Sequence, residues 1–528
     1  MTNSPDVHGT GAIAAPHTLA TQAGKDAFAK GGNALDAALA AAAALTVVYP
    51  HNTALGGDLV ALIRTPDGTI TCVNATGPAP AEQDVNRLVR VHGEKLPVRG
   101  VDTITVPGGV RGWQEIRHFG ARLDWAAQFE AAIRYAEDGV PVARSLAAAI
   151  IEESAALRAD QGASAVFEPG GVPLGRGDTL RQPELARSLR QLAAEGPETL
   201  YGGALGAKLV AGLRAAGCPI ALEDLATYEA EITAPMATDY AGHTVYTSPP
   251  NTQGILLLRT LRALAGKDPA SVGANLLARL FLDGINVRTS LLSDPRHASV
   301  DIENAGFHDL LASLEYPRNS ESALASPFVP TGDTVGVAAA DSDGFAVSLI
   351  QSIYHGFGAA VLEPTTGIIM QNRGMSFSLD PASPNFIQPG KRPAHTLMPV
   401  MVCRGESLRW VNATMGGQGQ PQIHAQILLG LLQGDSPQEA VSRPRWILGA
   451  QEAGDTPDTV YAEEDVLPAA VTALGDDSFP LRTVPSQTDW IGHANVVART
   501  EDGGLDAGSD PRADGEGAVV AIAEPGSE

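Results

Sequence analysis

Residues 334–353 read TVGVAAADSDGFAVSLIQSI, two runs of small and β-branched residues on either side of the turn sequence Asp-Ser-Asp-Gly. Two apolar runs joined by a short Asp- and Gly-rich segment predict a β-hairpin. The first strand is expected to start at Thr334, and the second to cover residues 345–353. The hairpin also marks a change along the chain, because helical patterns dominate before it and strand-like runs dominate after it.

Two helices are predicted near the start of the chain, and the second is expected to lie in the core. Thr18–Lys30 reads as a helix that stops at Gly31, and Asn33 can cap the next one. That helix, residues 34–48, is apolar on nearly all sides, and it is too short and alanine-rich to span a bilayer. Strands are expected at residues 366–372, 396–402, 407–415, 491–500 and 517–523, and a helix at 421–434.

Composition narrows the class of protein. The 528 residues are 44% hydrophobic and carry a net charge of −24, which argues against nucleic acid or an anionic membrane as a partner. Cys72, Cys218 and Cys403 are widely spaced, so we expect buried thiols and neither a disulfide framework nor a metal site. The first 17 residues lack the basic and apolar regions of a signal peptide, which favours a cytoplasmic protein.

Thr334 is a candidate nucleophile because it starts the hairpin. A threonine hydroxyl reacts poorly unless a base lies beside it, and cleavage of the preceding bond would make its own α-amino group that base. Gly332 and Asp333 can adopt the tight turn that self-cleavage requires, whereas Thr331 lies between Pro330 and another glycine. Threonine is also common in strands, so the local sequence alone leaves a purely structural role open.

A glycine-rich segment could supply an oxyanion hole. Residues 416–422 read GGQGQPQ, a flexible turn that leads into a helix with Pro421 at its first position. Backbone N–H groups at such a turn point outward and lie at the positive end of the helix dipole. An ordinary helix-capping loop would have the same sequence, and the pattern does not separate the two.

Longer segments resemble one protein family. The chain resembles the γ-glutamyltranspeptidases (glutathione hydrolases), a branch of the N-terminal nucleophile hydrolases, and especially its bacterial glutathione-hydrolase-like members and the cephalosporin acylases. The resemblance implies an α+β fold, a four-layered αββα sandwich, without a cofactor. It rests on KGGNALDAALAAAAALTVVYPHNTALGGD (30–58), DTVGVAAADSDGFAVSLIQSIYHGFGAAV (333–361), GIIMQNRGMSFSLDP (367–381), PGKRPAHTLMPVMV (389–402) and MGGQGQPQIHAQIL (415–428).

The resemblance implies a zymogen that cuts itself between Asp333 and Thr334. The products would be a large subunit, residues 1–333, and a small subunit, residues 334–528, held together in one intertwined unit. Thr334 would be the nucleophile, Ser352 would hold its hydroxyl, and the N–H groups of Gly419 and Gln420 would bind the oxyanion.

The positions that bind the glutamyl group in the family differ here. The arginine that binds its α-carboxylate is replaced by Thr76, and the aspartate that binds its α-amino group by Ser376. Arg373 suits a carboxylate through forked hydrogen bonds, and His355 could line the same pocket or simply be packed there. The substrate-binding residues that the resemblance implies are therefore Tyr354, Arg373, Ser376, His395 and Thr396.

These observations predict an autoprocessed amidohydrolase or acyltransferase. It would cleave γ-glutamyl or related small-molecule acyl amides, such as glutathione-type compounds, through an acyl-enzyme on Thr334. Two alternatives stay open: an acylase for amides without an α-amino group, such as glutaryl or cephalosporin compounds, and a non-catalytic, unprocessed homologue.

Overall fold

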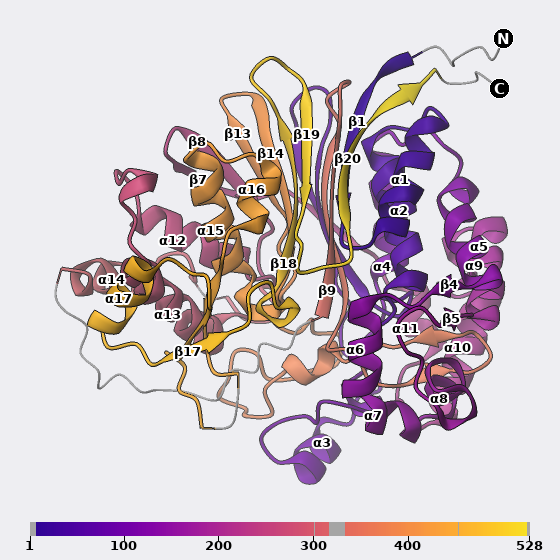
Figure 1. Cartoon of the computed structure of the whole chain (residues 1–528). Coiled ribbons are helices and arrows are strands. Elements are labelled where there is room, and N and C mark those ends of the chain that lie inside the picture. Colours follow the sequence, from indigo (N-terminus) through magenta and orange to yellow (C-terminus); the bar gives the residue numbers. More distant parts are fainter. Residues whose placement is uncertain (1–6, 300, 316–332, 452–453, 525–528) are drawn as a thin grey trace.

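The computed structural model describes residues 7–299, 301–315, 333–451 and 454–524. Two stacked β-sheets lie in the centre, and helices cover the outer face of each (Figure 1). The predicted four-layered α+β sandwich is therefore confirmed. Gly332 and Thr331 lie outside the described residues.

The first sheet carries the predicted hairpin at its centre. All neighbouring strands in it are antiparallel, and β9 pairs with β10 through the turn that the sequence predicted. Its strand order is β20 (Glu516–Ala523), β1 (Val7–Ala15), β9 (Asp333–Asp341), β10 (Ala346–Tyr354), β2 (Asp58–Arg64), β3 (Ile70–Ala75) and β6 (Glu231–Thr233).

The second sheet is also antiparallel and is formed mostly by the C-terminal part of the chain. Its strand order is β19 (Leu505–Ser509), β18 (His493–Arg499), β14 (Ser407–Met415), β13 (Val400–Arg404), β8 (His243–Thr247) and β7 (Met236–Tyr240).

Small side chains allow the two sheets to approach closely. The core between them is rich in alanine, including Ala338 and Ala340 on β9 and Ala413 on β14. At Gly336 a Cβ atom would lie 2.7 Å from the backbone carbonyl carbon of Ala413, so only glycine fits this crossing. The Asn495 side chain also donates to the Gly336 carbonyl at 2.9 Å. These contacts hold β9 against the second sheet.

Helices of the first outer layer pack on the first sheet (Figure 1, indigo to magenta). A shorter helix, α3 (Val85–His92), packs in a small separate cluster through Leu88. The layer comprises α1 (Thr18–Ala29), α2 (Ala34–Val48), α4 (Gly109–His118), α5 (Glu130–Asp138), α6 (Arg144–Glu152), α7 (Ser154–Ala159), α8 (Gln161–Phe167), α9 (Pro183–Glu195), α10 (Ala204–Ala215) and α11 (Leu222–Ala226).

Helix α2 is buried along its whole length, as its sequence predicted. Asn33 caps it by accepting from the backbone N–H groups of Leu35 and Asp36, and the Asp36 carboxylate accepts from the Asn33 N–H in return. Asp341 at the end of β9 also accepts from the Ala34 N–H at 2.8 Å. The capped helix is thereby fixed to the turn end of the hairpin.

The second outer layer packs on the second sheet. It comprises α12 (Gly254–Ala263), α13 (Ala274–Leu291), α14 (Phe307–Ser313), α15 (Gln420–Leu432), α16 (Pro437–Ser442) and α17 (Pro468–Asp476). Short strands form small additional sheets: β4 (Val140–Pro141), β5 (Thr179–Leu180), β11 (Leu362–Glu363), β12 (Ile368–Ile369), β15 (Trp446–Leu448), β16 (Val460–Glu463) and β17 (Leu481–Val484).

Single turns of 3-10 helix connect these elements. They are η1 (Val101–Thr103), η2 (Trp125–Phe129), η3 (Pro169–Gly171), η4 (Pro197–Thr199), η5 (Pro269–Ser271), η6 (Arg373–Ser376), η7 (Gly417–Gly419) and η8 (Asp489–Ile491). Of these, η6 and η7 lie at the candidate site described below.

Several predicted elements differ from the structure in their bounds. The strand expected at 366–372 is reduced to Ile368–Ile369, and the one expected at 396–402 begins only at Val400, after a proline that has no N–H to donate. The helix expected from Pro421 begins one residue earlier, at Gln420.

Each of the two large sheets contains strands from before position 333 and strands from after it. In the first sheet, β9 lies between β1 and β10, and in the second β13 pairs with β8. A cut before Thr334 would therefore leave two interleaved chains.

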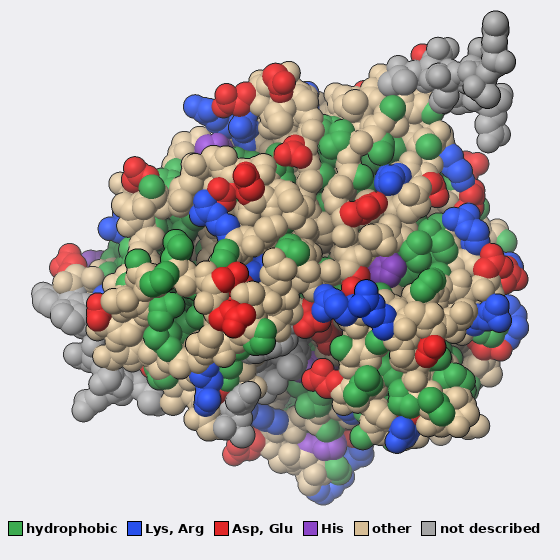
Figure 2. Space-filling model, viewed as in Figure 1, with side chains coloured by type: hydrophobic (Ala, Val, Ile, Leu, Met, Phe, Trp, Pro, Cys, Tyr) green, Lys and Arg blue, Asp and Glu red, His purple; other side chains and the backbone are tan. Residues whose placement is uncertain are grey.

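Within the described ranges, no helix is both long and apolar enough to cross a membrane. Figure 2 shows acidic and basic side chains interspersed over the viewed face.

Candidate active site

The start of β9 places three polar groups in a chain of hydrogen bonds. The buried Thr334 hydroxyl lies 3.1 Å from the Ser352 Oγ on β10, and that Oγ lies 2.6 Å from the Asp333 carbonyl oxygen. The Tyr354 N–H donates to the same Oγ at 2.8 Å. Because a hydroxyl has one proton, Ser352 donates to the carbonyl and accepts from the other two groups. The carbonyl of the predicted cleavage bond is thus polarised beside the predicted nucleophile.

A local irregularity in β10 produces this arrangement. The pairing of β10 with β9 shifts between Gln351 and Tyr354, and Tyr354 has a φ of 83°. Such bulges redirect side chains at functional sites. The sequence located Thr334 and Ser352, but it gave no sign of the bulge that sets their geometry.

Acidic side chains surround Asp333. A cavity of about 270 Å³ is lined by Asp333, Glu152, Glu153, Asp489 and His355, among others. Burial raises the pKa of the Asp333 carboxyl to about 7, and the neighbouring negative charges act in the same direction. The folded precursor therefore disfavours the ionised form of Asp333.

Replacing Asp333 by asparagine in an uncut Thr334→Ala background should stabilise the precursor in a pH-dependent way. The folded pKa of about 7 lies above the ordinary 3.8, so the destabilisation by this carboxylate is absent below pH 3.8 and complete above pH 7. We expect a larger rise in Tm at pH 8 than at pH 5, with the single variant Thr334→Ala as the control. Equal rises at both pH values would contradict this assignment.

Four of the five predicted substrate-binding residues form one cluster, in which Tyr354, Arg373 and Thr396 are buried and Ser376 is half-buried. The Arg373 guanidinium lies 3.6 Å from the centroid of the Tyr354 ring. It donates to the Thr396 hydroxyl at 2.9 Å, to the Ala394 carbonyl at 3.0 Å and to the Ser376 hydroxyl. Ser376 and Thr396 therefore hold Arg373 in place. A cation fixed in this way is suited to bind an anion.

His395 lies beside this cluster, but its ring is already occupied. Its Nδ1 accepts from the backbone N–H groups of Thr396 and Leu397, so the proton is on Nε2, which donates to Asp58 at 3.1 Å. Burial, reinforced by the charge of Arg373, lowers the pKa of His395 well below its usual value. The geometry argues against the predicted contact with substrate, because burial and Asp58 make His395 a neutral structural residue.

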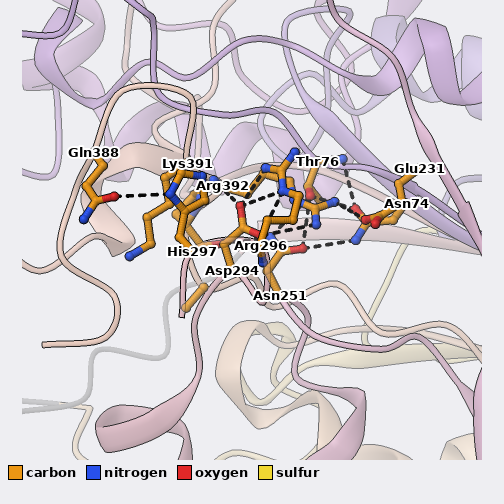
Figure 3. A network of polar contacts seen from close by, with 12 residues as sticks. Asn74, Thr76, Glu231, Asn251, Asp294, Arg296, His297, Gln388, Lys391 and Arg392 are labelled. Carbon is orange, nitrogen blue, oxygen red and sulfur yellow. Dashed lines mark hydrogen bonds and ion pairs between the residues drawn. The ribbon is translucent and has the colours of Figure 1, made fainter. Parts of the chain in front are cut away.

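A polar network fixes the segment that carries His395 and Thr396 (Figure 3). Arg392 binds Glu231 at 2.6 Å and Asp294 at 3.4 Å, and the Asn251 side chain donates to the Pro393 carbonyl at 2.8 Å. Thr76 donates to Asn74 at 2.7 Å within this network. The network joins residues before position 333 to residues after it.

The glycine-rich turn carries the two predicted oxyanion donors, Gly419 and Gln420. The N–H of Gly419 donates to the Gly416 carbonyl at 2.8 Å, and that of Gln420 donates to the Gly417 carbonyl. The two predicted oxyanion donors are thus used inside the turn. Gly416 and Gly417, with φ of 148° and 52°, have N–H groups without an acceptor in the described part of the chain. Their N–H groups are therefore further candidates for oxyanion donors beside the two that the resemblance implies.

The structure adds one residue that the sequence did not single out. Arg288 on α13 is 7% exposed, and its Nη1 has no hydrogen-bond partner among the described residues. The helix carries other polar and charged residues, so the sequence gave no sign that this arginine would be buried. His355 lines the cavity next to Asp333.

Comparisons with known proteins agree over the full length. The gamma-glutamyltranspeptidase family model matches residues 20–520. The oxamate amidohydrolase proenzyme of Klebsiella pneumoniae is 36% identical over 98% of this chain and 99% of its own length. The glutathione hydrolase-like YwrD proenzyme of Bacillus subtilis is 35% identical over 97% and 98%, respectively. The solved cephalosporin acylase of Bacillus halodurans superposes with a TM-score of 0.85 at 32% identity, covering 98% of this chain and 97% of that one.

Proposed function

Because the chain belongs to the gamma-glutamyltranspeptidase family, we propose that it is an amidohydrolase that cuts itself before Thr334 and then uses Thr334 as its nucleophile. The observation that carries this proposal is the hydrogen-bonded series from the Thr334 hydroxyl through Ser352 to the Asp333 carbonyl. Residues 1–333 and 334–528 would then be two subunits of one precursor.

Self-cleavage follows from this geometry. The Thr334 Oγ attacks the Asp333 carbonyl carbon, and the Ser352 hydroxyl stabilises the negative charge on the oxygen. The C–N bond breaks, and the departing nitrogen takes the proton that the Thr334 hydroxyl loses, to become the Thr334 amine. Water then hydrolyses the Asp333 ester, which releases the Asp333 carboxylate and frees the Thr334 hydroxyl.

The same hydroxyl would then act on substrate. The Thr334 α-amino group takes the proton while Oγ attacks the amide carbonyl, and backbone N–H groups of the glycine-rich turn 416–420 hold the oxyanion. The amine leaves with that proton, and water or a second amine resolves the acyl ester. A Thr334 amine with an ordinary pKa of about 8 can accept a proton near neutral pH.

The site favours the acylase alternative over γ-glutamyl substrates. An α-ammonium needs an acidic partner when it is desolvated, and Ser376 stands where the family has an aspartate. Arg373 instead offers a buried cation to a carboxylate. Relatives named as an oxamate amidohydrolase and a cephalosporin acylase support this choice. γ-Glutamyl amide cleavage is the second candidate, because another relative is named glutathione hydrolase-like.

Intact-mass spectrometry followed by a substrate comparison tests the proposal. We expect a small subunit that begins Thr-Val-Gly-Val-Ala, and a higher kcat/KM for glutaryl than for γ-glutamyl p-nitroanilide. A preference for the γ-glutamyl compound would overturn the acylase assignment. A single chain that persists through long incubation would support the non-catalytic homologue instead.

A further inference from the structure

The segment that follows α2 places a buried carboxamide against the predicted nucleophile. Asn52 is 2% exposed, and its side-chain Nδ2 donates to the carbonyl oxygen of Thr334 at 3.3 Å. Backbone hydrogen bonds fix the residue on both sides: the Asn52 N–H donates to the Tyr49 carbonyl at 3.0 Å, and the Ile353 N–H donates to the Asn52 carbonyl at 3.2 Å. Asn52 is thus held between the end of α2 and the strand that carries Ser352.

The other polar atom of this carboxamide is unused. Asn52 Oδ1 is buried and has no hydrogen-bond partner among the described residues. A buried acceptor without a donor costs free energy, which a donor arriving beside it would recover. In an extended strand the N–H and C=O groups of one residue point to the same edge. The carboxamide that binds the Thr334 carbonyl therefore lies at the edge of β9 toward which the Thr334 nitrogen also points.

Cleavage before Thr334 changes the donors at that nitrogen. In the precursor the nitrogen belongs to a planar peptide group and has a single N–H in a fixed direction. After the cut it is an amine with two hydrogens, or an ammonium with three, and these hydrogens can rotate. Asn52 and Asp333 line the same cavity of about 270 Å³, so the new amine forms beside a space that can accommodate it.

We propose that the Asn52 carboxamide holds the first residue of the small subunit at two points in the mature enzyme. Its Nδ2 keeps the Thr334 carbonyl, and its Oδ1 accepts from the newly formed α-amino group. The inference rests on the proposed function, since the amine exists only after the cut. Asn52 is then a positioning residue, because it fixes the orientation of the amine beside the hydroxyl from which the amine takes its proton.

Charged side chains around the cavity set the background for the pKa of this amine. The titratable groups that line the cavity near Asn52 are Asp333, Glu152, Glu153, Asp489, Arg99, His51 and His355. Arg99 pairs with Glu153, and Arg144 binds Asp489 at 3.3 Å. This background is common to the variants compared below, so a difference between them reports on position 52.

A carboxylate at position 52 tests the contact through the pH profile. Asn52→Asp keeps an acceptor for the amine and adds a negative charge, which favours the ammonium form and raises its pKa. In the processed enzyme we expect the acidic limb of the kcat/KM profile to move up by about one pH unit. Ala148→Asp is the matched control, because it adds the same charge to the wall of the same cavity from α6, and its profile should move much less. Equal shifts in the two variants, or none in Asn52→Asp, would overturn the proposal.

An apolar side chain of similar size separates the two contacts of Asn52. Asn52→Leu removes both hydrogen bonds, so kcat per processed molecule should fall about 10-fold, while KM changes little and the acidic limb stays in place. Both variants at position 52 lose the bond to the Thr334 carbonyl. If that bond alone mattered, both would lose activity equally and neither would shift the profile, contrary to the proposal. Both should still cut themselves, and a complete block of cleavage in both would place the role of Asn52 in the precursor instead.

Acetylation of the α-amine measures its pKa without any substrate. The pH dependence of labelling of the Thr334 amine by acetic anhydride, followed by mass spectrometry of the small subunit, should show the same upward shift in Asn52→Asp. If the shift appears in a cut protein that hydrolyses no amide, the proposed function fails and the role of Asn52 stands. If amides are hydrolysed while labelling and pH profile are unchanged in Asn52→Asp, the role of Asn52 is wrong. A wild-type chain that is never cut would overturn both.

Discussion

Thr334→Ala is expected to remain a single uncut chain of 528 residues without amidase activity. The hydroxyl is the attacking group both in self-cleavage and in turnover, so its loss removes both reactions. The fold should persist, because losing one small side-chain group at a strand start costs only about 1–2 kcal/mol of the free energy of unfolding. Intact-mass spectrometry and an anilide assay measure the two losses, and circular dichroism measures the fold.

Thr334→Ser is the matched control for this variant. It keeps the hydroxyl, so it should still cut itself and hydrolyse amides, at lower rates. If Thr334→Ala were nevertheless processed, the nucleophile would lie elsewhere, and Thr331 would be the next residue to replace.

Ser352→Ala is expected to slow self-cleavage by about 10²- to 10³-fold, the usual effect of removing one oxyanion donor. The Ser352 hydroxyl donates to the Asp333 carbonyl at 2.6 Å, where negative charge develops as Thr334 attacks. It also accepts from the Thr334 hydroxyl, so turnover by any processed fraction should fall as well. The fraction of cut chain, followed over time by mass spectrometry, gives the rate.

Ser352→Thr provides the control, because threonine keeps the hydroxyl at the same atom position. Its cleavage rate should stay close to that of the wild type. Equal cleavage rates for the alanine variant and the wild type would show that Ser352 does not stabilise the oxyanion of the precursor.

Sequence patterns correctly predicted the secondary-structure elements that depend on residues close to one another in the chain. The hairpin of β9 and β10 and the Asn33 cap of α2 depend on residues close in sequence, and both were predicted correctly. Strand β1, VHGTGAIAA, was not predicted because it has few β-branched residues. It becomes a strand by pairing with β9 and β20, far away in the chain.

The residues of the candidate site also fall into those that the sequence could predict and those that depend on the tertiary fold. Thr334 was singled out because it starts the predicted hairpin, and Ser352 because of the family resemblance. The contacts of His395 and of the Gly419 N–H were not predictable, because packing decides which partners occupy a ring nitrogen or an N–H group. The burial of Arg288 was missed because only the tertiary fold encloses this side chain of α13.

The central position of β9 has a consequence for how the working enzyme can be made. The predicted cut falls at the first residues of a strand that is flanked on one side by β1 and on the other by β10. Before the cut, these strands assemble within one molecule; afterwards, the same assembly would require two separate polypeptides to meet with both sheets incomplete. The mature enzyme would thus inherit its fold from the precursor, and its lifetime would depend on a high barrier to unfolding, since refolding from separated subunits would be a slow second-order process.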